Sequence, residues 1–315
     1  MDNYEKNHKI YLEAFMNGEL KELYQIIKDD DSIGFKLYFD KICIKVYYRG
    51  RKLFEISKDN KVNKYKIKYD ITKSIEIAEN ILNLISKGDP CYIVDLDLTK
   101  IINGIKVGIN KYYSKKSGNE NEIRQIIVKE NNKYRTDYYM IDEEYNIKDK
   151  KYENNPDIIG LYDKRNNTKK QFTLSLIELK VGKSTSSGEN GIYDHFIKIN
   201  EILSNKEIEQ KIKKDAEHNF KIRVELGLIN LKPGSTNISK AIDIKEINLV
   251  FIIANCVEQS EIFKNEIEKI KEISNKNIDV MFAISSFMGY GLYGSKIYTL
   301  EEFEKYLDVI KSIKE

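Results

Sequence analysis

Residues 156–180, PDIIGLYDKRNNTKKQFTLSLIELK, contain two β-prone runs separated by a polar segment. The first run, residues 157–162, starts with Asp157, and the second, residues 172–180, ends in Glu178-Leu179-Lys180. The Lys, Arg, Asn and Thr side chains between the runs are typical of a turn. Two such runs around a turn predict a β-hairpin.

The pairing of this hairpin decides which side chains meet at its open end. If the turn is centred between Asn167 and Thr168, Asp157 lies opposite Glu178, and opposed residues on one face are about 5 Å apart at Cβ. Glu178 and Lys180 are two positions apart and share a face. Two carboxylates this close repel each other unless a cation lies between them, and such oxygen donors suit Mg²⁺. The hairpin therefore predicts a metal site with a lysine beside it.

The pattern Pro156-Asp157, twenty residues, Glu178-Leu179-Lys180 resembles the PD-(D/E)XK phosphodiesterase superfamily, which has a restriction-endonuclease-like fold. The likeness covers roughly residues 119–200. It implies that Asp157 and Glu178 hold Mg²⁺ or Mn²⁺ with help from the carbonyl of Leu179, and that Lys180 orients or deprotonates the attacking water. From the residues alone, the alternative is a surface hairpin whose acids and lysine are merely solvated.

Two further acids are candidates for the third metal ligand. Residues 119–131 predict a helix with an apolar stripe, and Glu122 stands at the edge of that stripe. The resemblance implies that an acid on this helix helps to hold the metal; a solvated glutamate is the alternative. The strand expected at residues 138–145 places Asp142 and Glu144 on one face, so Glu144 is the rival to Glu122.

His195 is a further candidate, in the first turn of a helix expected at residues 191–203. It could contact a phosphate or take part in proton transfer, and a capping or packing histidine is the alternative. The Gln-x-x-x-Tyr signature of some RecB-like relatives is absent, which puts membership in that branch in doubt.

Composition describes a globular chain and excludes several classes of protein. The 315 residues are 41% hydrophobic and 33% charged, with a formal net charge of +3. The three cysteines are odd in number and widely spaced, which argues against a disulfide framework and predicts a reducing compartment. The longest apolar run, residues 249–257, is shorter than the roughly 20 residues of a membrane span. With no secretory signal at the amino terminus, we expect a cytoplasmic protein, and the AT-rich composition favours a bacterial one.

Hydrophobic periodicity divides the chain into two expected domains. Residues 1–115 predict an α+β module: helical spacing at 4–28, four alternating runs between 35 and 69 that form an antiparallel meander, and a helix near 71–86. Residues 116–315 predict a mixed-sheet α/β (α+β) domain, and the resemblance makes its core restriction-endonuclease-like. Its later elements are expected as helices at 206–219, 261–273 and 300–313 and strands at 247–254 and 280–285.

Basic residues concentrate in the meander. Residues 41–69 contain ten Lys or Arg against two acids, interleaved with tyrosines that could stack on bases. The candidates for binding nucleic acid are Lys45, Arg49, Arg51 and Lys52. In this lysine-rich chain the solvated outer face of a sheet is the alternative.

Two glycine motifs lack features that nucleotide-binding loops require. Gly182-Lys183-Ser184 lacks the earlier glycine of a phosphate-binding loop, because position 177 is Ile. Residues 289–294 match GxGxxG, but no helix is expected to start directly on them and no acid follows at the required distance. A mobile loop that approaches substrate is the alternative for this segment.

The sequence therefore favours a Mg²⁺- or Mn²⁺-dependent nuclease that acts on nucleic acid, on DNA rather than RNA. Two alternatives remain open: a nuclease that acts on RNA, and a non-catalytic module on the same fold that binds nucleic acid or protein.

Overall fold

The structure is a computed structural model that describes residues 3–30, 32–69, 79–85, 91–113, 120–133, 136–143, 145, 147, 155–163, 171–181, 187–231, 242–254, 260–274, 276–285 and 289–314. The chain is a mixed α/β protein with two sheets, and it divides into two compact units, Met1–Ile126 and Ile127–Glu315. The division falls inside a helix, α5 (Glu120–Lys133), whereas the sequence placed the boundary at residues 115 and 116.

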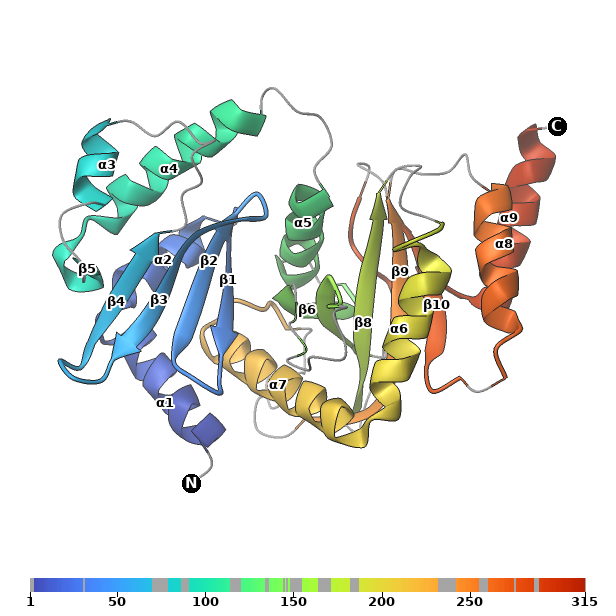
Figure 1. The fold of residues 1–315 in the computed structure, drawn as a ribbon, viewed down its shortest axis with the longest axis horizontal. Helices are drawn as coiled ribbons and strands as arrows, with labels where there is room; N and C mark the ends of the chain where they lie inside the picture. The colour runs from blue at the N-terminus through green and yellow to red at the C-terminus, as the bar shows by residue number, and fades with distance from the viewer. Residues whose placement is uncertain are drawn as a thin grey trace. The chain divides into compact units, whose positions relative to one another are not determined.

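The first unit contains a five-stranded antiparallel sheet in which sequence neighbours are also spatial neighbours (Figure 1). Its strands are β1 (Ile33–Tyr38), β2 (Cys43–Tyr48), β3 (Arg51–Asp59), β4 (Lys64–Tyr69) and the short β5 (Cys91–Tyr92). The alternating runs of residues 35–69 thus form a meander, because each strand pairs with the next through a short turn.

The described part of the first unit also contains four complete α-helices. The helices are α1 (Asn3–Met16), α2 (Lys21–Asp29), α3 (Glu79–Ile85) and α4 (Leu98–Tyr113). Phe15 of α1 contacts Phe35 of β1 edge to face, and the Tyr11 hydroxyl bonds the backbone of Cys43. α4 was not expected from the sequence, since Gly104 and Gly108 weaken its helical propensity.

The second unit contains a six-stranded mixed sheet in the order β11-β10-β9-β8-β7-β6. Its strands are β6 (Tyr138–Glu143), β7 (Ile158–Tyr162), β8 (Gln171–Val181), β9 (Asp243–Ala254), β10 (Asp279–Ser285) and β11 (Ile297–Thr299). β8, β9 and β10 are parallel, whereas the remaining pairs are antiparallel. Parallel neighbours need crossover connections, which the helices of this unit provide.

A continuous hydrophobic core lies between one face of this sheet and four helices. The helices are α6 (Ile192–Ser204), α7 (Lys206–Glu225), α8 (Ser260–Lys271) and α9 (Leu300–Lys314), and Figure 1 shows α6 beside β8 and β9. Phe172, Leu174 and Leu176 of β8 face this core. Because side chains alternate along a strand, Glu178 and Lys180 continue the same face at the carboxyl end of β8.

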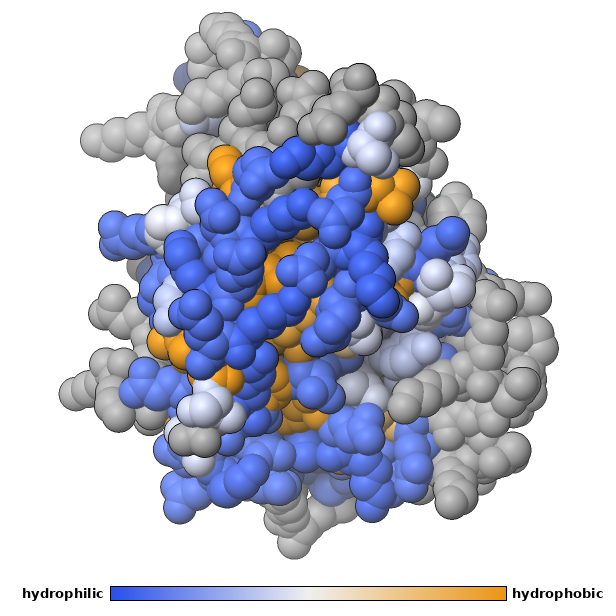
Figure 2. Space-filling model, turned by 90° about the vertical axis from the view of Figure 1, so that its right-hand side faces the viewer, coloured by the Kyte–Doolittle hydropathy of each residue, from blue (hydrophilic) through white to orange (hydrophobic). Residues whose placement is uncertain are grey.

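The surface formed by α8 and α9 is mostly hydrophilic, with smaller hydrophobic patches between the hydrophilic side chains (Figure 2). This is the pattern of amphipathic helices that bury one stripe in the core. Within the described segments, no helix combines the length and the apolar character that crossing a membrane requires.

Candidate functional site

The β7–β8 hairpin has the register that the sequence predicted. Ile158 pairs with Ile177, and Tyr162 pairs with Thr173. One step beyond the last pair, the Asp157 carboxylate accepts a hydrogen bond from the backbone N–H of Leu179 at 2.9 Å. Asp157 is therefore fixed at the open end of the hairpin, beside residues 178–180.

Glu178 and Lys180 are both buried, with relative exposures of 1% and 4%. Their neighbours on the parallel strand β9 are Phe251 and Ile253, which belong to the hydrophobic core. The core face of β8 thus changes from apolar to ionisable over its last residues. Charged groups are almost never fully buried unless they are paired, so this position needs a compensating partner.

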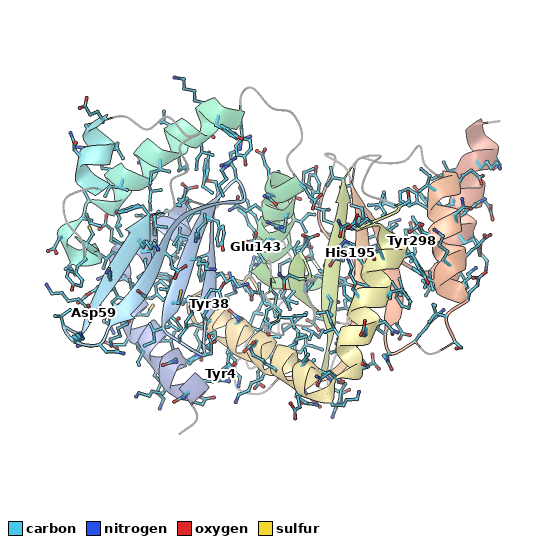
Figure 3. All side chains as sticks on the ribbon, in the orientation of Figure 1. Tyr4, Tyr38, Asp59, Glu143, His195 and Tyr298 are labelled. Carbon is cyan, nitrogen blue, oxygen red and sulfur yellow. The ribbon has the colours of Figure 1, made fainter. Side chains whose placement is uncertain are left out.

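His195 of α6 supplies one partner for Glu178. Its Nδ1 lies 2.9 Å from Glu178 Oε2, and Figure 3 shows His195 beside the upper part of β8. The other oxygen, Glu178 Oε1, is buried and has no hydrogen-bond partner among the described residues. Burial raises the pKa of the Glu178 carboxyl above its ordinary value of 4.5; the hydrogen bond with His195 opposes this shift and the charge of Asp157 adds to it.

The turn before α6 positions Lys180. Lys180 Nζ donates to the backbone carbonyl of Asn190 at 2.9 Å. Asn190 has a φ of 65°, a left-handed conformation that asparagine tolerates better than most residues. Its own N–H donates to the Asp194 carboxylate at 2.9 Å, which ties the turn to the first turn of α6. Asn190 was not singled out from the sequence, although the Gly-Glu-Asn-Gly run at residues 188–191 indicates a turn there.

A divalent cation fits the donors at this site. Asp157 and Glu178 are both oxygen ligands of the kind that Mg²⁺ and Mn²⁺ accept. The negative charge of Asp157 raises the pKa of the Glu178 carboxyl further, and Glu178 Oε1 is a buried acceptor with no hydrogen-bond partner among the described residues. In the described part of the chain, no cluster of three or more His, Cys, Asp or Glu side chains has the arrangement of a metal site.

The two candidate third acids are Glu122 and Glu144. Glu122 belongs to the first unit, and its carboxylate is 2.8 Å from Arg49 Nη2. Glu144 lies outside the described residues. Asp142, on β6, is buried. Burial lowers the pKa of Arg223, and the negative charges of Asp142 and Glu143 oppose that shift. A register shift between Met140 and Asp142 interrupts the simple alternation expected for this strand.

The four basic candidates on the meander divide into two pairs. Arg49 and Arg51 flank the β2–β3 turn and contact side chains of their own unit: the Arg51 guanidinium stacks 4.3 Å from the Tyr112 ring, and its Nε donates to Tyr113 Oη at 3.0 Å. Lys45 on β2 and Lys52 on β3 are half-buried, and Lys45 Nζ lies 5.0 Å from the ring of Tyr38.

The glycine- and tyrosine-containing segment 289–294 is hydrogen-bonded into the second unit. The carboxylate of Glu130 accepts from Tyr290 N, Asn131 Nδ2 donates to Tyr290 O, and Leu292 N donates to Asn131 Oδ1. Gly294 N donates to the Asp137 carboxylate at 2.7 Å. These contacts connect α5 to the start of β6, so the segment has a structural role here.

Comparison with models of protein families, with curated proteins and with solved structures finds no match to this chain.

Proposed function

We propose that this protein is a metal-dependent nuclease with a restriction-endonuclease-like core, and that it hydrolyses phosphodiester bonds in DNA in preference to RNA. The observation that carries the proposal is the meeting of Asp157, Glu178 and Lys180 at the end of one hairpin, with Glu178 Oε1 buried and unpartnered among the described residues. If Glu178 were only solvated, it would be exposed instead of 1% exposed.

The proposed roles follow from the donors and their positions. Asp157, Glu178 and the carbonyl of Leu179 would hold Mg²⁺ or Mn²⁺. The chemistry such a cation supplies is Lewis acidity, which offsets the negative charge of a phosphodiester and favours attack by water. Lys180, aimed by the Asn190 carbonyl, would orient that water and stabilise negative charge that develops on the phosphoryl oxygens.

The order of elements supports the same proposal. The hairpin is preceded by α5 and β6 and followed by α6, which is the setting on which the superfamily resemblance rests. The return of the chain through α6 and α7 to the parallel strand β9 gives a mixed sheet around the site. The proposed core lies within the domain expected at residues 116–315.

Nucleic acid as substrate is supported by the first unit. Lys36, Lys45 and Lys68 stand in one cross-strand row with Glu55, on the face opposite Phe35, Val46 and Phe54. Lys36 is buried and Glu55 separates Lys45 from Lys68, so the lysines of this row that a phosphate could reach are the half-buried Lys45 and the exposed Lys68. Lys36, Lys41 and Lys45 each lie within 5.6 Å of the Tyr38 ring.

The test compares the purified protein with Glu178→Gln on plasmid, linear and single-stranded DNA and on RNA, with and without Mg²⁺ or Mn²⁺. We expect the wild type to cleave DNA only with metal and Glu178→Gln to be inactive. Glu301→Gln, the same change at an exposed position of α9, is the matched control and should retain activity. Equal degradation by wild type and Glu178→Gln would contradict the site, and preferential cleavage of RNA would transfer the proposal to that substrate.

A further inference from the structure

We propose that His195 is a positioning residue for Glu178: its Nδ1–H holds Oε2, so that Oε1 alone is presented to the cation. This inference rests on the proposed function, because it concerns the same site. It differs from a role in contacting phosphate or transferring protons, since the imidazole acts through Glu178 and needs no contact with substrate.

The geometry of the pair indicates which side chain donates the hydrogen bond between His195 and Glu178. A carboxylate that binds a metal is deprotonated and only accepts hydrogen bonds, so in that state the His195 nitrogen 2.9 Å from Glu178 Oε2 is the donor. Both side chains are buried, with exposures of 1% and 9%. The two oxygens of Glu178 therefore have different environments: one is bonded to Nδ1 and the other has no partner among the described residues.

The helix that carries His195 is itself fixed. Phe196 and Ile199 of α6 are buried in the hydrophobic core. At the start of the helix, Tyr193 N donates to the carboxylate of Glu266 at 3.0 Å, and Lys269 pairs with the same carboxylate. The imidazole is thus attached to a rigid element, which is what orienting a metal ligand requires.

Orientation matters because the carboxylate otherwise rotates. The last torsion of a glutamate is broad and roughly two-fold, so a carboxylate with no hydrogen bond to hold it samples several directions. Losing a partner that orients a metal ligand lowers metal affinity by about 10- to 100-fold. The effect of His195 should therefore appear in metal binding before any substrate is added.

Asparagine and glutamine at position 195 both carry an amide, so comparing them separates a positioning role of His195 from a packing role. In His195→Asn the side-chain nitrogen is attached to Cγ, as Nδ1 is, so the amide can donate to Glu178 Oε2. In His195→Gln the nitrogen is one bond further out and matches Nε2. His195→Leu removes both donors and keeps an apolar side chain of similar size.

The experiment titrates Mn²⁺ into metal-free, full-length protein and measures the dissociation constant by calorimetry. We expect His195→Leu and His195→Gln to weaken Mn²⁺ binding about 10- to 100-fold and His195→Asn to restore it to within about 3-fold of wild type. Far-UV circular dichroism and thermal unfolding check that each variant folds. If His195→Leu does not fold, the comparison of His195→Asn with His195→Gln tests the inference by itself.

The outcomes separate this inference from the proposed function. No saturable Mn²⁺ binding by wild type, or equal binding by Glu178→Gln, would overturn the metal site itself. Loss of binding in Glu178→Gln with wild-type binding in His195→Leu would overturn only the role of His195. Equal weakening in Asn and Gln would mean that His195 acts by packing, which also overturns the inference.

Discussion

The Asp157 carboxylate and the backbone N–H of Leu179 are joined by a hydrogen bond of 2.9 Å. The last backbone pair of the β7–β8 ladder is Ile158 with Ile177. The hydrogen bond from Leu179 to the Asp157 side chain extends the contact between the two strands just beyond that pair. It places Asp157, the residue just before β7, next to Glu178 and Lys180. The same residue therefore closes the hairpin and contributes charge to the site.

Asp157→Asn and Asp157→Ala should separate these two roles. The asparagine keeps an acceptor for Leu179 N but loses the charge, so we expect stability within about 1 kcal/mol of wild type and at least 10-fold weaker Mn²⁺ binding. The alanine also loses the hydrogen bond and should destabilise the protein by about 2 kcal/mol. Urea unfolding and calorimetry measure the two effects; equal stability of both variants would contradict the structural role.

Glu178→Gln should stabilise the metal-free protein. The substitution removes a buried charge with one unpartnered oxygen, and about 1 kcal/mol is expected at pH 7. Because burial raises the Glu178 pKa in the folded state, the folded protein binds this proton more tightly than the unfolded chain. The wild type should therefore lose stability as the pH rises from the ordinary carboxyl pKa of 4.5 through the raised value.

The variant lacks that titration, so the stability difference between Glu178→Gln and wild type should be small at pH 4 and grow towards pH 8. Chemical unfolding of both proteins across this range, in the presence of a chelator, measures it. Saturating Mn²⁺ should reverse the order, because it binds the folded wild type. A difference that does not change with pH would contradict the raised pKa.

Lys180→Met should remove cleavage and spare metal binding. Methionine fills a similar volume at this buried position and carries no charge. We expect cleavage of plasmid DNA to fall by about 10²- to 10⁴-fold, with the Mn²⁺ dissociation constant within about 3-fold of wild type. A protein that cleaves DNA equally well with methionine at this position would exclude Lys180 from the reaction.

Arg51→Lys should reveal whether this residue supports the fold or contacts nucleic acid. Its guanidinium stacks on Tyr112 and its Nε donates to Tyr113 Oη, contacts that a lysine reproduces poorly. We expect destabilisation of about 1 kcal/mol with no change in the salt dependence of DNA binding. Because lysine keeps the charge, Arg51→Gln tests the phosphate contact: if Arg51 binds a phosphate, this variant lowers the slope by about 1, which anisotropy titrations at several salt concentrations measure.

Gly50→Ala should be much more harmful than Gly188→Ala. Both glycines have positive φ, 71° and 76°, so alanine is strained at each by about 1 kcal/mol. At Gly50 an added Cβ would also lie 2.1 Å from Asn121 Cβ, whereas nothing lies within 4 Å at Gly188. We expect about 3 kcal/mol for Gly50→Ala, measured by thermal unfolding; similar losses at both positions would contradict the close approach of Asn121.

Much of the fold could be predicted from local sequence patterns, because such patterns depend only on residues that are close in the sequence. The alternating runs of residues 35–69 and the hairpin at 157–180 formed as strands, with the predicted register between Ile158 and Tyr162. α4 was missed, because its two glycines obscure a helix whose stability comes from burying Ile101, Ile105 and Ile109. The segment 289–294 reads as a loop from its glycines, and only its contacts with Asn131 reveal that it is held in place.

The sequence by itself determined the chemistry of the hairpin: two acids and a lysine at spacings that an antiparallel pair brings to one end. Only the tertiary structure decided which groups surround them, since α6 is brought over β8 by packing of Phe196 rather than by any local signal. That packing buries Glu178, places His195 against one of its oxygens and leaves the other without a partner among the described residues. The physical reason is that burial and cross-element hydrogen bonds depend on residues far apart in the chain, whereas strand register depends on a turn of a few residues.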